Sequence, residues 1–471
     1  MSRPSALSPL ESGFLHVESA RTPMHMGTLG IFDGPPLRDG RGRLRLEDIR
    51  HRIEERLDLV PKLRRRIQRP ILPGAPPVWA DDPHFDIAHH VELRRLSRPG
   101  SNGQLWEECN QLLGQPLDRE WPLWHLCIID GLADGQVAVV ARIHHALADG
   151  VAGVEMATLL FDVGTKTVPA PTAHGQPITT WHPQTAPSLG TRAVQDLDRL
   201  NAIGYRWMER GRRATRHPLR TGRDAVRLGG AFATLVSSGL LRPATSLNRA
   251  IGSERLGLGA RVPLDSLSAT AHSLDVTLND IVLTAVGGGV ARLLEQRGEA
   301  RPPDIQVLVP VGLEPDHRES LDNRVSAWFV RVPLGPADPF ERLHSVSRSS
   351  GRARVHREEL AAEAVLDLAA AAPQQVIGCV ANLINHQPLF NLVVTNVPGP
   401  SDPLYLLGAA MVEAYPFVPL AGNLTFGLAA MSYDNYLSFG ILADLLTCPD
   451  ASTFVGGLQD DLDALSATTR R

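Results

Sequence analysis

The segment "ARIHHALADGVAG", residues 141–153, constrains the fold more than any other part of the chain. Valines and isoleucine alternate with other residues up to His144, and this period of two predicts a β-strand. After Gly150, apolar residues recur at the spacing of a helix: Val151, Val154, Met156, Leu159 and Leu160. The chain must therefore pass from a strand into a helix across two histidines and one aspartate.

Two interpretations of this turn remain open from spacing alone. In the first, Asp149 is only an N-cap of the helix, and His144 and His145 are polar residues at a strand end. In the second, one neutral imidazole is a general base, Asp149 fixes the loop, and Gly150 allows a close approach that a Cβ would hinder. Because neighbouring strand residues point to opposite faces, only one histidine can face a substrate atom, and the other supports it.

Other catalytic motifs are absent from the sequence. It has no GxSxG, no GxxxxGK[ST] and no HExxH, and "GLGARV" lacks the third glycine of a dinucleotide fingerprint. The four cysteines lie far apart without CxxC spacing, which indicates neither a metal site nor a disulfide framework. The pattern favours direct transfer to a substrate hydroxyl or amine, without a metal or a cofactor, as the imidazole removes its proton.

The chain is long enough for two large domains. Strand and helix patterns alternate up to about Asp162, and again from about Gly252 to the end, which predicts an α/β fold in both regions. Between them, "VGTKTVPAPTAHGQPITTWHPQTAPSLGT" is rich in proline, threonine and glycine, and Arg-rich helical sequence follows. We therefore expect an N-terminal domain over 1–165, a linker and helical connector over 166–250, and a C-terminal domain over 251–471.

Several strands are expected within these domains. In the first they are "MHMGTLGIF", "FDIAHHVELRRL", "LWHLCIID" and "QVAVVARIHH", the last two joined by a hairpin at "GLADG". Alternation along the second of these would explain His89 and His90. In the second domain they are "DIQVLVPV", "VSAWFVRVPL", "FNLVVTNVPGP" and "NYLSFGILAD".

Charge and hydropathy restrict partners and location. A formal net charge of -4 argues against nucleic acid as a partner. The N-terminus has no apolar signal region, no stretch approaches the roughly 18 apolar residues of a membrane span, and the cysteine usage fits a reducing cytoplasm. Between Tyr205 and Arg227 there are eight arginines against Glu209 and Asp224, so contact with anionic lipid and a solvated helix face both stay open.

The chain resembles a known family. "HHALADG" matches the HHxxxDG motif of the CoA-dependent acyltransferase superfamily. More narrowly, the chain is similar to the bacterial wax ester synthase/acyl-CoA:diacylglycerol acyltransferase family. That resemblance is carried in order by "LSPLESGFL", "TPMHMGTLGIF", "PLDREWPLWHLCIIDGL", "TLNDIVLTAVGGGVARLL", "NLVVTNVPGP" and "LSFGILAD".

The resemblance implies a fold, a reaction and a base. The fold is α/β (α+β), with two chloramphenicol-acetyltransferase-like domains, each a mixed sheet flanked by helices, and a channel between them. His145 is the base, while His144, Asp149 and Gly150 support it. Long-chain acyl-CoA is a substrate rather than a cofactor, and the acceptor is diacylglycerol, which gives triacylglycerol, or a fatty alcohol, which gives a wax ester. Such an enzyme would work in the cytoplasm or peripherally, on the inner membrane face or on lipid droplets.

Alternatives to this function are an O-acyltransferase for another lipid or polyketide hydroxyl, and a non-catalytic lipid-binding protein of the same fold. Three further positions match family elements and are candidate substrate contacts: Trp124, Asn279 and Asn396. Each has a structural alternative. Trp124 fits a packed turn, Thr277 and Asp280 beside Asn279 fit a capping box, and Asn396 fits a turn at a strand end.

Overall fold

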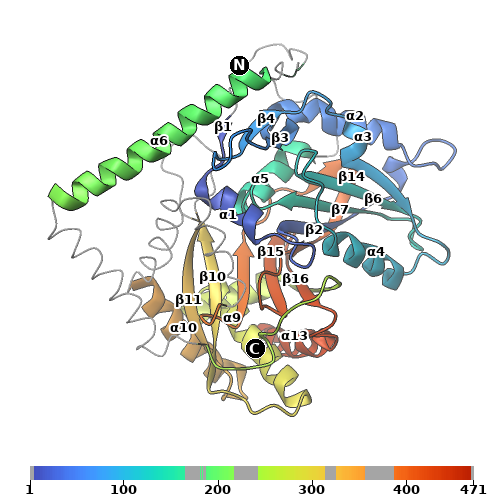
Figure 1. Cartoon of the computed structure of the whole chain (residues 1–471). Coiled ribbons are helices and arrows are strands. Elements are labelled where there is room, and N and C mark those ends of the chain that lie inside the picture. Colours follow the sequence, from blue (N-terminus) through green and yellow to red (C-terminus); the bar gives the residue numbers. More distant parts are fainter. Residues whose placement is uncertain are drawn as a thin grey trace.

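The computed structural model describes residues 5–164, 181, 183, 187–216, 242–312, 325–355 and 387–467. Two sheets, each with helices against it, form the two halves of the molecule (Figure 1). Both sheets are mixed, because each contains parallel and antiparallel pairs. This agrees with the expected α/β architecture.

The sheet of the N-terminal half has seven strands in the order β5-β6-β7-β2-β14-β13-β8. Their bounds are β2 His25–Phe32, β5 Val91–Arg95, β6 Trp124–Asp130, β7 Val137–His144, β8 Asp162–Val163, β13 Leu404–Leu406 and β14 Ala409–Phe417. A small second sheet contains β1 Ser5–Ala6, β3 Arg65–Gln68 and β4 Val78–Asp81. The helices of this half are α1 Pro9–Val17, α2 Leu46–Arg56, α3 Ile87–His90, α4 Asn102–Gly114 and α5 Gly150–Leu160, with 3-10 turns at Pro35–Leu37, Leu57–Leu59 and Pro61–Arg64.

The sheet of the C-terminal half has six strands in the order β11-β10-β12-β15-β16-β9. Their bounds are β9 Arg255–Pro263, β10 Asp304–Gly312, β11 Val325–Pro333, β12 Leu392–Val397, β15 Phe426–Tyr433 and β16 Tyr436–Asp444. The helices are α8 Leu264–Ser273, α9 Leu278–Gln296, α10 Pro339–Val355 and α13 Ala451–Ala467. The helix α6, Leu189–Arg216, lies between the two halves in sequence.

Each half has its own apolar core. In the C-terminal core, α9 lies so close to α13 that a Cβ on Gly289 would be 2.6 Å from the carbonyl oxygen of Phe454. In the N-terminal core, α2 and α5 contribute Ile49, Ile53 and Met156, all buried. The halves are joined through α4, where the side-chain oxygen of Asn110 accepts a hydrogen bond of 2.7 Å from Gly257 N–H in β9.

Most strands expected from the sequence are confirmed. The hairpin at "GLADG" joins β6 and β7 as an antiparallel pair, and Gly131 and Gly135 have φ of 93° and 79° there, a conformation that favours glycine. The strands "DIQVLVPV", "VSAWFVRVPL", "FNLVVTNVPGP" and "NYLSFGILAD" correspond to β10, β11, β12 and β16.

The expectation of a strand across "FDIAHHVELRRL" is wrong in its first part. The Asp86 side chain accepts a hydrogen bond from Ala88 N–H and caps the helical turn α3, so β5 begins only at Val91. His89 instead stacks on Trp121 with ring centroids 4.0 Å apart, and His90 stacks on Trp124 at 4.5 Å. Aromatic packing, rather than alternation along a strand, therefore explains the two histidines.

The N-terminal sheet takes strands from both ends of the chain. β13 and β14 belong to the range 251–471, yet β14 pairs with β2, with Phe417 opposite Gly27. The range 251–471 therefore contributes to both sheets, which the sequence did not indicate. Within the expected connector over 166–250, residues 189–216 form α6, while 166–180, 182, 184–186 and 217–241 lie outside the described residues. The boundaries near 165 and 250 stay predictions, as does a channel between the domains.

No single helix in the described part of the chain is long and apolar enough to cross a bilayer. Among the described helices, the bent pair α8 and α9 is the only one that reaches that length and composition together.

Candidate active site

The end of β7 is held by hydrogen bonds from both sides. His144 N–H donates to the carbonyl of Leu123 at 3.0 Å, and His145 N–H donates to the carbonyl of Met24 at 2.8 Å. Leu123 precedes β6, and Met24 precedes β2, so the two strands that flank β7 both fix the turn. The histidine pair therefore sits at a strand end, as the sequence predicted.

The helix α5 begins as expected from its sequence. Asp149 is the N-cap, and its side chain accepts a hydrogen bond of 2.9 Å from Ala152 N–H. A Cβ on Gly150 would lie 3.3 Å from Cγ2 of Val397 at the end of β12. The start of α5 is thus in close contact with the C-terminal sheet, which is the close approach that a glycine allows.

The His144 side chain is fully buried, with 0% of its surface exposed. Ala146 N–H donates to its Nδ1 at 2.9 Å, so Nδ1 acts as an acceptor and carries no proton. The other ring nitrogen, Nε2, lies 3.3 Å from Oε1 of Glu18. Both ring nitrogens of His144 are therefore used in holding the turn.

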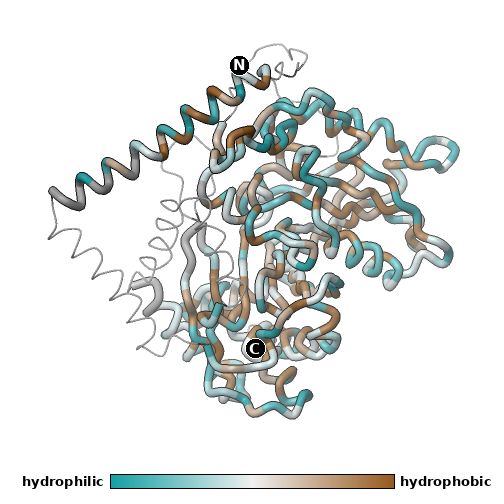
Figure 2. The backbone as a smooth tube through the Cα atoms, in the orientation of Figure 1, coloured by the Kyte–Doolittle hydropathy of each residue, from teal (hydrophilic) through white to brown (hydrophobic). Residues whose placement is uncertain are grey.

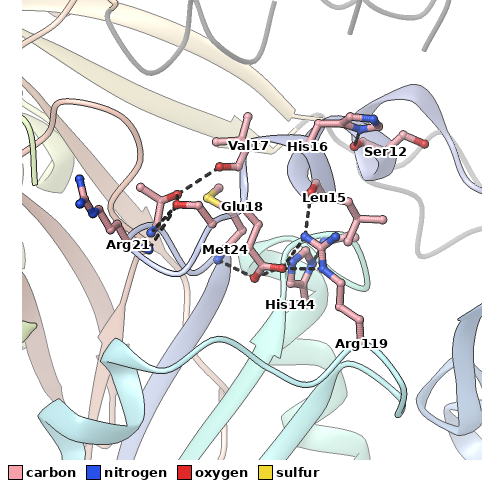
Figure 3. Close-up of polar contacts among 12 residues, drawn as sticks. Ser12, Leu15, His16, Val17, Glu18, Arg21, Met24, Arg119 and His144 are labelled. Carbon is pink, nitrogen blue, oxygen red and sulfur yellow. Dashed lines mark hydrogen bonds and ion pairs between the residues drawn. The ribbon is translucent and has the colours of Figure 1, made fainter. Parts of the chain in front are cut away.

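Glu18 is the central acceptor of this arrangement, between Arg119 and His144 (Figure 3). Its Oε2 accepts hydrogen bonds from Nε and Nη2 of Arg119 at 2.9 and 2.6 Å, and its Oε1 accepts one from Met24 N–H at 3.2 Å. Arg119 also donates to the carbonyl of Leu15, at the end of α1. Burial would raise the pKa of Glu18, but contacts with His144, Arg119 and Met24 N–H lower the pKa to about 2.

His145 has a different environment from His144. Its side chain is half-buried, and its ring stacks on Phe14 of α1 with centroids 4.6 Å apart and planes 18° from parallel. Burial, and to a lesser extent the neighbouring His144, lowers the pKa of His145 from 6.5 to about 4. The ring is therefore neutral near pH 7 and has the protonation state that a general base requires.

A third histidine lies beside the pair. His25 is opposite His144 in the register of β2 and β7, so the two side chains share one face of the sheet. His25 is buried, and burial followed by the charge of Arg142 holds its pKa well below the usual value. Arg142 is fixed on α4 by bonds of 2.8 and 3.0 Å to the carbonyls of Leu112 and Gln115.

The structure places Trp124 in the core. It is buried, its indole N–H donates to the carbonyl of Leu63 at 2.7 Å, and its ring stacks on His90. This is the packing role that the sequence analysis offered as the alternative to substrate contact. A contact between Trp124 and substrate stays a prediction.

The two asparagines are in the C-terminal half. Asn279 is half-buried in the first turn of α9, where Thr277 and Asp280 form the expected capping box with bonds of 3.2 and 3.0 Å. Asn396 is near the end of β12, and alternation gives it the face of the buried Val394 rather than that of Val397. The substrate roles of both asparagines stay predictions.

Sequence reasoning missed Phe14, Glu18 and Arg119. They lie in segments that carried the family resemblance, "LSPLESGFL" with the residues after it and "PLDREWPLW", but no spacing relates Glu18 to Arg119, which is 101 residues away. Among the described residues, no group of three His, Cys, Asp or Glu side chains could hold a metal ion. Chemistry without a metal or a cofactor stays a prediction from the sequence.

Two family models match the chain. The model of the wax ester synthase/diacylglycerol acyltransferase catalytic domain matches residues 7–282, and the model of the C-terminal domain of the same family matches residues 321–466. A relative named as a probable diacylglycerol O-acyltransferase, from Mycobacterium tuberculosis, is 31% identical over 478 residues, which cover 99% of this chain and 96% of the relative.

Solved structures share the fold. A wax ester synthase/diacylglycerol acyltransferase from Marinobacter aquaeolei has a TM-score of 0.68 and 23% identity, covering 99% of this chain and 100% of that one. A starter condensation domain of rhizomide synthetase, in complex with C8-CoA, has a TM-score of 0.56 and 14% identity, covering 99% and 95%. At these identities the likeness concerns the fold alone.

Proposed function

The chain belongs to the wax ester synthase/diacylglycerol acyltransferase family and is an acyltransferase, and we propose that it transfers a long-chain acyl group from acyl-CoA to diacylglycerol with His145 as the general base. The observation that carries the proposal is the half-buried, neutral imidazole of His145 at the end of β7. Acyl-CoA is a substrate in this reaction, and the proposal includes no cofactor.

The proposed reaction is a direct transfer. As His145 removes the proton of the acceptor hydroxyl, the oxygen attacks the thioester carbonyl, the C–S bond breaks, and the imidazolium returns the proton to the CoA thiolate. The products are triacylglycerol and free CoA. A positioned base of this kind contributes about 10²- to 10⁴-fold to the rate, and substrate orientation must supply much of the rest.

The contacts of the two histidines support different roles for them. His144 is surrounded by fixed partners, because Ala146 N–H occupies Nδ1 and Glu18 lies 3.3 Å from Nε2. His145 is tied through its backbone to Met24 and through its ring face to Phe14, so its position is fixed while its ring remains half-buried. We assign His144, Glu18 and Arg119 to positioning, and His145 to proton transfer.

Asp149 and Gly150 support the same site. Asp149 caps α5 and thereby fixes where the turn ends, and Gly150 lets that turn approach Val397. Since Val397 follows Asn396 in "TNVPGP", the C-terminal half supplies a wall of the proposed site from this strand end.

An acceptor panel tests the proposed function. Purified protein is incubated with labelled palmitoyl-CoA and, separately, with diacylglycerol, a long-chain alcohol or no acceptor, and the labelled products are separated. We expect triacylglycerol with diacylglycerol, and release of CoA in equal amount. A wax ester alone would reassign the acceptor to fatty alcohols. Absence of any labelled ester would contradict the proposal and favour a non-catalytic lipid-binding protein.

A further inference from the structure

The helix α6 projects from the N-terminal half along one edge of the molecule (Figure 1). It has 28 residues, and at 1.5 Å per residue it is about 42 Å long. A soluble helix of this length normally buries an apolar face against a core. The side chains of α6 show a different pattern, with apolar residues on the solvent side.

The amino-terminal half of α6 is anchored to the loop that follows β3. The buried carboxylate of Asp196 accepts hydrogen bonds from the backbone N–H groups of Ile71 and Leu72, at 2.6 and 3.0 Å. Arg199 donates to the same carboxylate at 2.8 Å, and Arg192 donates to the carbonyl of Arg69 at 3.0 Å. Polar contacts on one side of α6 therefore fix the orientation of its other side.

That other side carries an apolar stripe. Val194, Leu197, Tyr205 and Met208 are each 50% to 60% exposed. At 3.6 residues per turn their positions fall within about 80° of the helix circumference. Figure 2 shows the alternation of apolar and polar residues along this helix. Ile71, beside the Asp196 anchor, is also exposed and extends the stripe onto the neighbouring loop.

The charge of α6 indicates what covers the stripe. The helix contains seven arginines and three acidic residues, a difference of 7 − 3 = +4, whereas the whole chain has a formal charge of -4. One of the three acids, Asp196, is already used by Arg199 and two backbone N–H groups. An apolar stripe on a basic helix matches an anionic lipid surface, and like charge opposes its pairing with the same helix of a second copy.

We propose that the apolar stripe of α6, formed by Val194, Leu197, Tyr205 and Met208 and extended by Ile71, seats the protein on an anionic phospholipid surface. In this arrangement the stripe enters the boundary between headgroups and acyl chains, and Arg212, an exposed arginine on the same side of the helix, contacts the phosphates. Binding itself is independent of the chemistry at His145. Binding would give the enzyme access to a diacylglycerol acceptor in that surface, and this role of binding rests on the proposed function.

The anchored, exposed stripe bears on two alternatives that the sequence left open. The arginine-rich segment from Tyr205 to Arg227 fitted both lipid contact and a solvated helix face. The exposed apolar residues of α6 lie both before this segment, at Val194 and Leu197, and within it, at Tyr205 and Met208. Because the Asp196 anchor holds them outward, they favour lipid contact. Arg220, Arg223 and Arg227 lie outside the described residues.

Vesicle flotation tests the proposal with a matched pair of variants. The first combines Val194→Gln, Leu197→Gln, Tyr205→Gln and Met208→Gln, which removes the stripe at exposed positions without altering the Asp196 anchor. The control combines Leu445→Gln and Leu446→Gln, which are 40% and 76% exposed after β16 in the other half. Vesicles contain phosphatidylcholine alone or phosphatidylcholine with phosphatidylglycerol, at low and high salt, and circular dichroism verifies folding.

We expect the wild type and the control to float with the anionic vesicles, less at high salt, and the stripe variant to partition about tenfold more weakly. Equal flotation of the stripe variant and the wild type would overturn the proposal, as would equal binding to neutral and anionic vesicles. A wild-type dimer that the stripe variant converts to a monomer, with flotation unchanged, would assign the stripe to a second copy instead.

Acyl-transfer assays separate this proposal from the proposed function. With a detergent-dispersed short-chain diacylglycerol, the stripe variant should transfer acyl groups at the wild-type rate. With diacylglycerol embedded in anionic vesicles, its rate should fall by about the same factor as its partitioning into those vesicles. A wild type that floats but transfers no acyl group would contradict only the proposed function. A stripe variant that is as active as the wild type on both acceptors would contradict only the docking proposal.

Discussion

The two halves of the molecule bury ionisable side chains in different ways. Both halves bury ion pairs, such as Arg52 with Asp162 in the N-terminal half, but the N-terminal half also contains histidines whose pKa burial lowers, to about 4 for His90, about 3 for His125 and about 4 for His145. In the described part of the C-terminal half, buried ionisable groups form acid–base pairs, such as Arg255 with Asp444 at 3.3 Å. A half-buried pair, Arg297 with Asp450, joins the end of α9 to the loop before α13.

This difference indicates where proton transfer can occur. A buried ion pair keeps both charges, because releasing a proton would leave its partner charged without compensation. A neutral buried imidazole can accept a proton when a substrate group supplies one. This supports the proposal that the end of β7 carries the chemistry, next to Val397 of the C-terminal half, which lies against Gly150.

The largest effect is expected from removing the proposed base. His145→Ala should lower acyl transfer by about 10²- to 10⁴-fold, because a positioned general base is lost. His272→Ala, at an exposed histidine of α8 in the other half, is the matched control and should leave the rate unchanged. The rate of triacylglycerol formation measures both. A folded His145→Ala protein that retains the wild-type rate would remove the base assignment.

Breaking a pair in the C-terminal half should affect stability instead. Asp444→Ala leaves Arg255 buried without its carboxylate, so we expect a loss of about 3–5 kcal/mol in the free energy of unfolding. Asp460→Ala breaks an exposed pair with Arg292 and should cost less than about 1 kcal/mol. Denaturant titration gives both values. Equal losses for the two variants would mean that burial of the first pair has no energetic consequence.

Replacing Glu18, which contacts His144 and Arg119, should lower the rate less than replacing His145. Glu18→Gln keeps the size of the side chain but weakens its contacts with His144 and Arg119, and a displacement of about 1 Å at a reacting group costs up to about 10²-fold. We expect kcat to fall by about 10- to 100-fold with little change in KM. The control is Glu413→Gln on β14, which loses a half-exposed pair with Arg261 of β9. Unchanged kcat in Glu18→Gln would remove Glu18 from positioning.

The smallest effects are expected at the starts of α5 and α9. Asp149→Ala and Thr277→Ala each remove an N-cap, so each should lower the free energy of unfolding by about 0.5–2 kcal/mol. Only Asp149→Ala should also lower the rate, because α5 follows the histidine turn directly. If both variants lose the same fraction of activity, the reaction depends equally on the two halves, which would contradict a site that depends mainly on the N-terminal half.

Local features of the fold were predictable from the sequence, and long-range contacts were not. The strand β7, the hairpin before it and the cap at Asp149 follow from alternation, glycines and an N-cap residue within about twenty residues. The pairing of β14 with β2, and the bonds from Arg119 to Glu18, join segments whose spacing carries no signal. The turn α3 was missed because four residues are too few for a helical period.

The central claim is that a neutral imidazole at the end of β7 accepts the proton, and the pH dependence of kcat/KM tests it most directly. Only neutral His145 is active in this account, so activity is lost as the pH falls through its pKa of about 4. We therefore predict a level profile from pH 8 to about pH 5.5 and a decline below that, approaching tenfold per pH unit under pH 4. Buried histidines also weaken folding as the pH falls below 6.5, so circular dichroism must accompany each point. A profile that has already lost half its activity near pH 6.5 in folded protein would contradict the account.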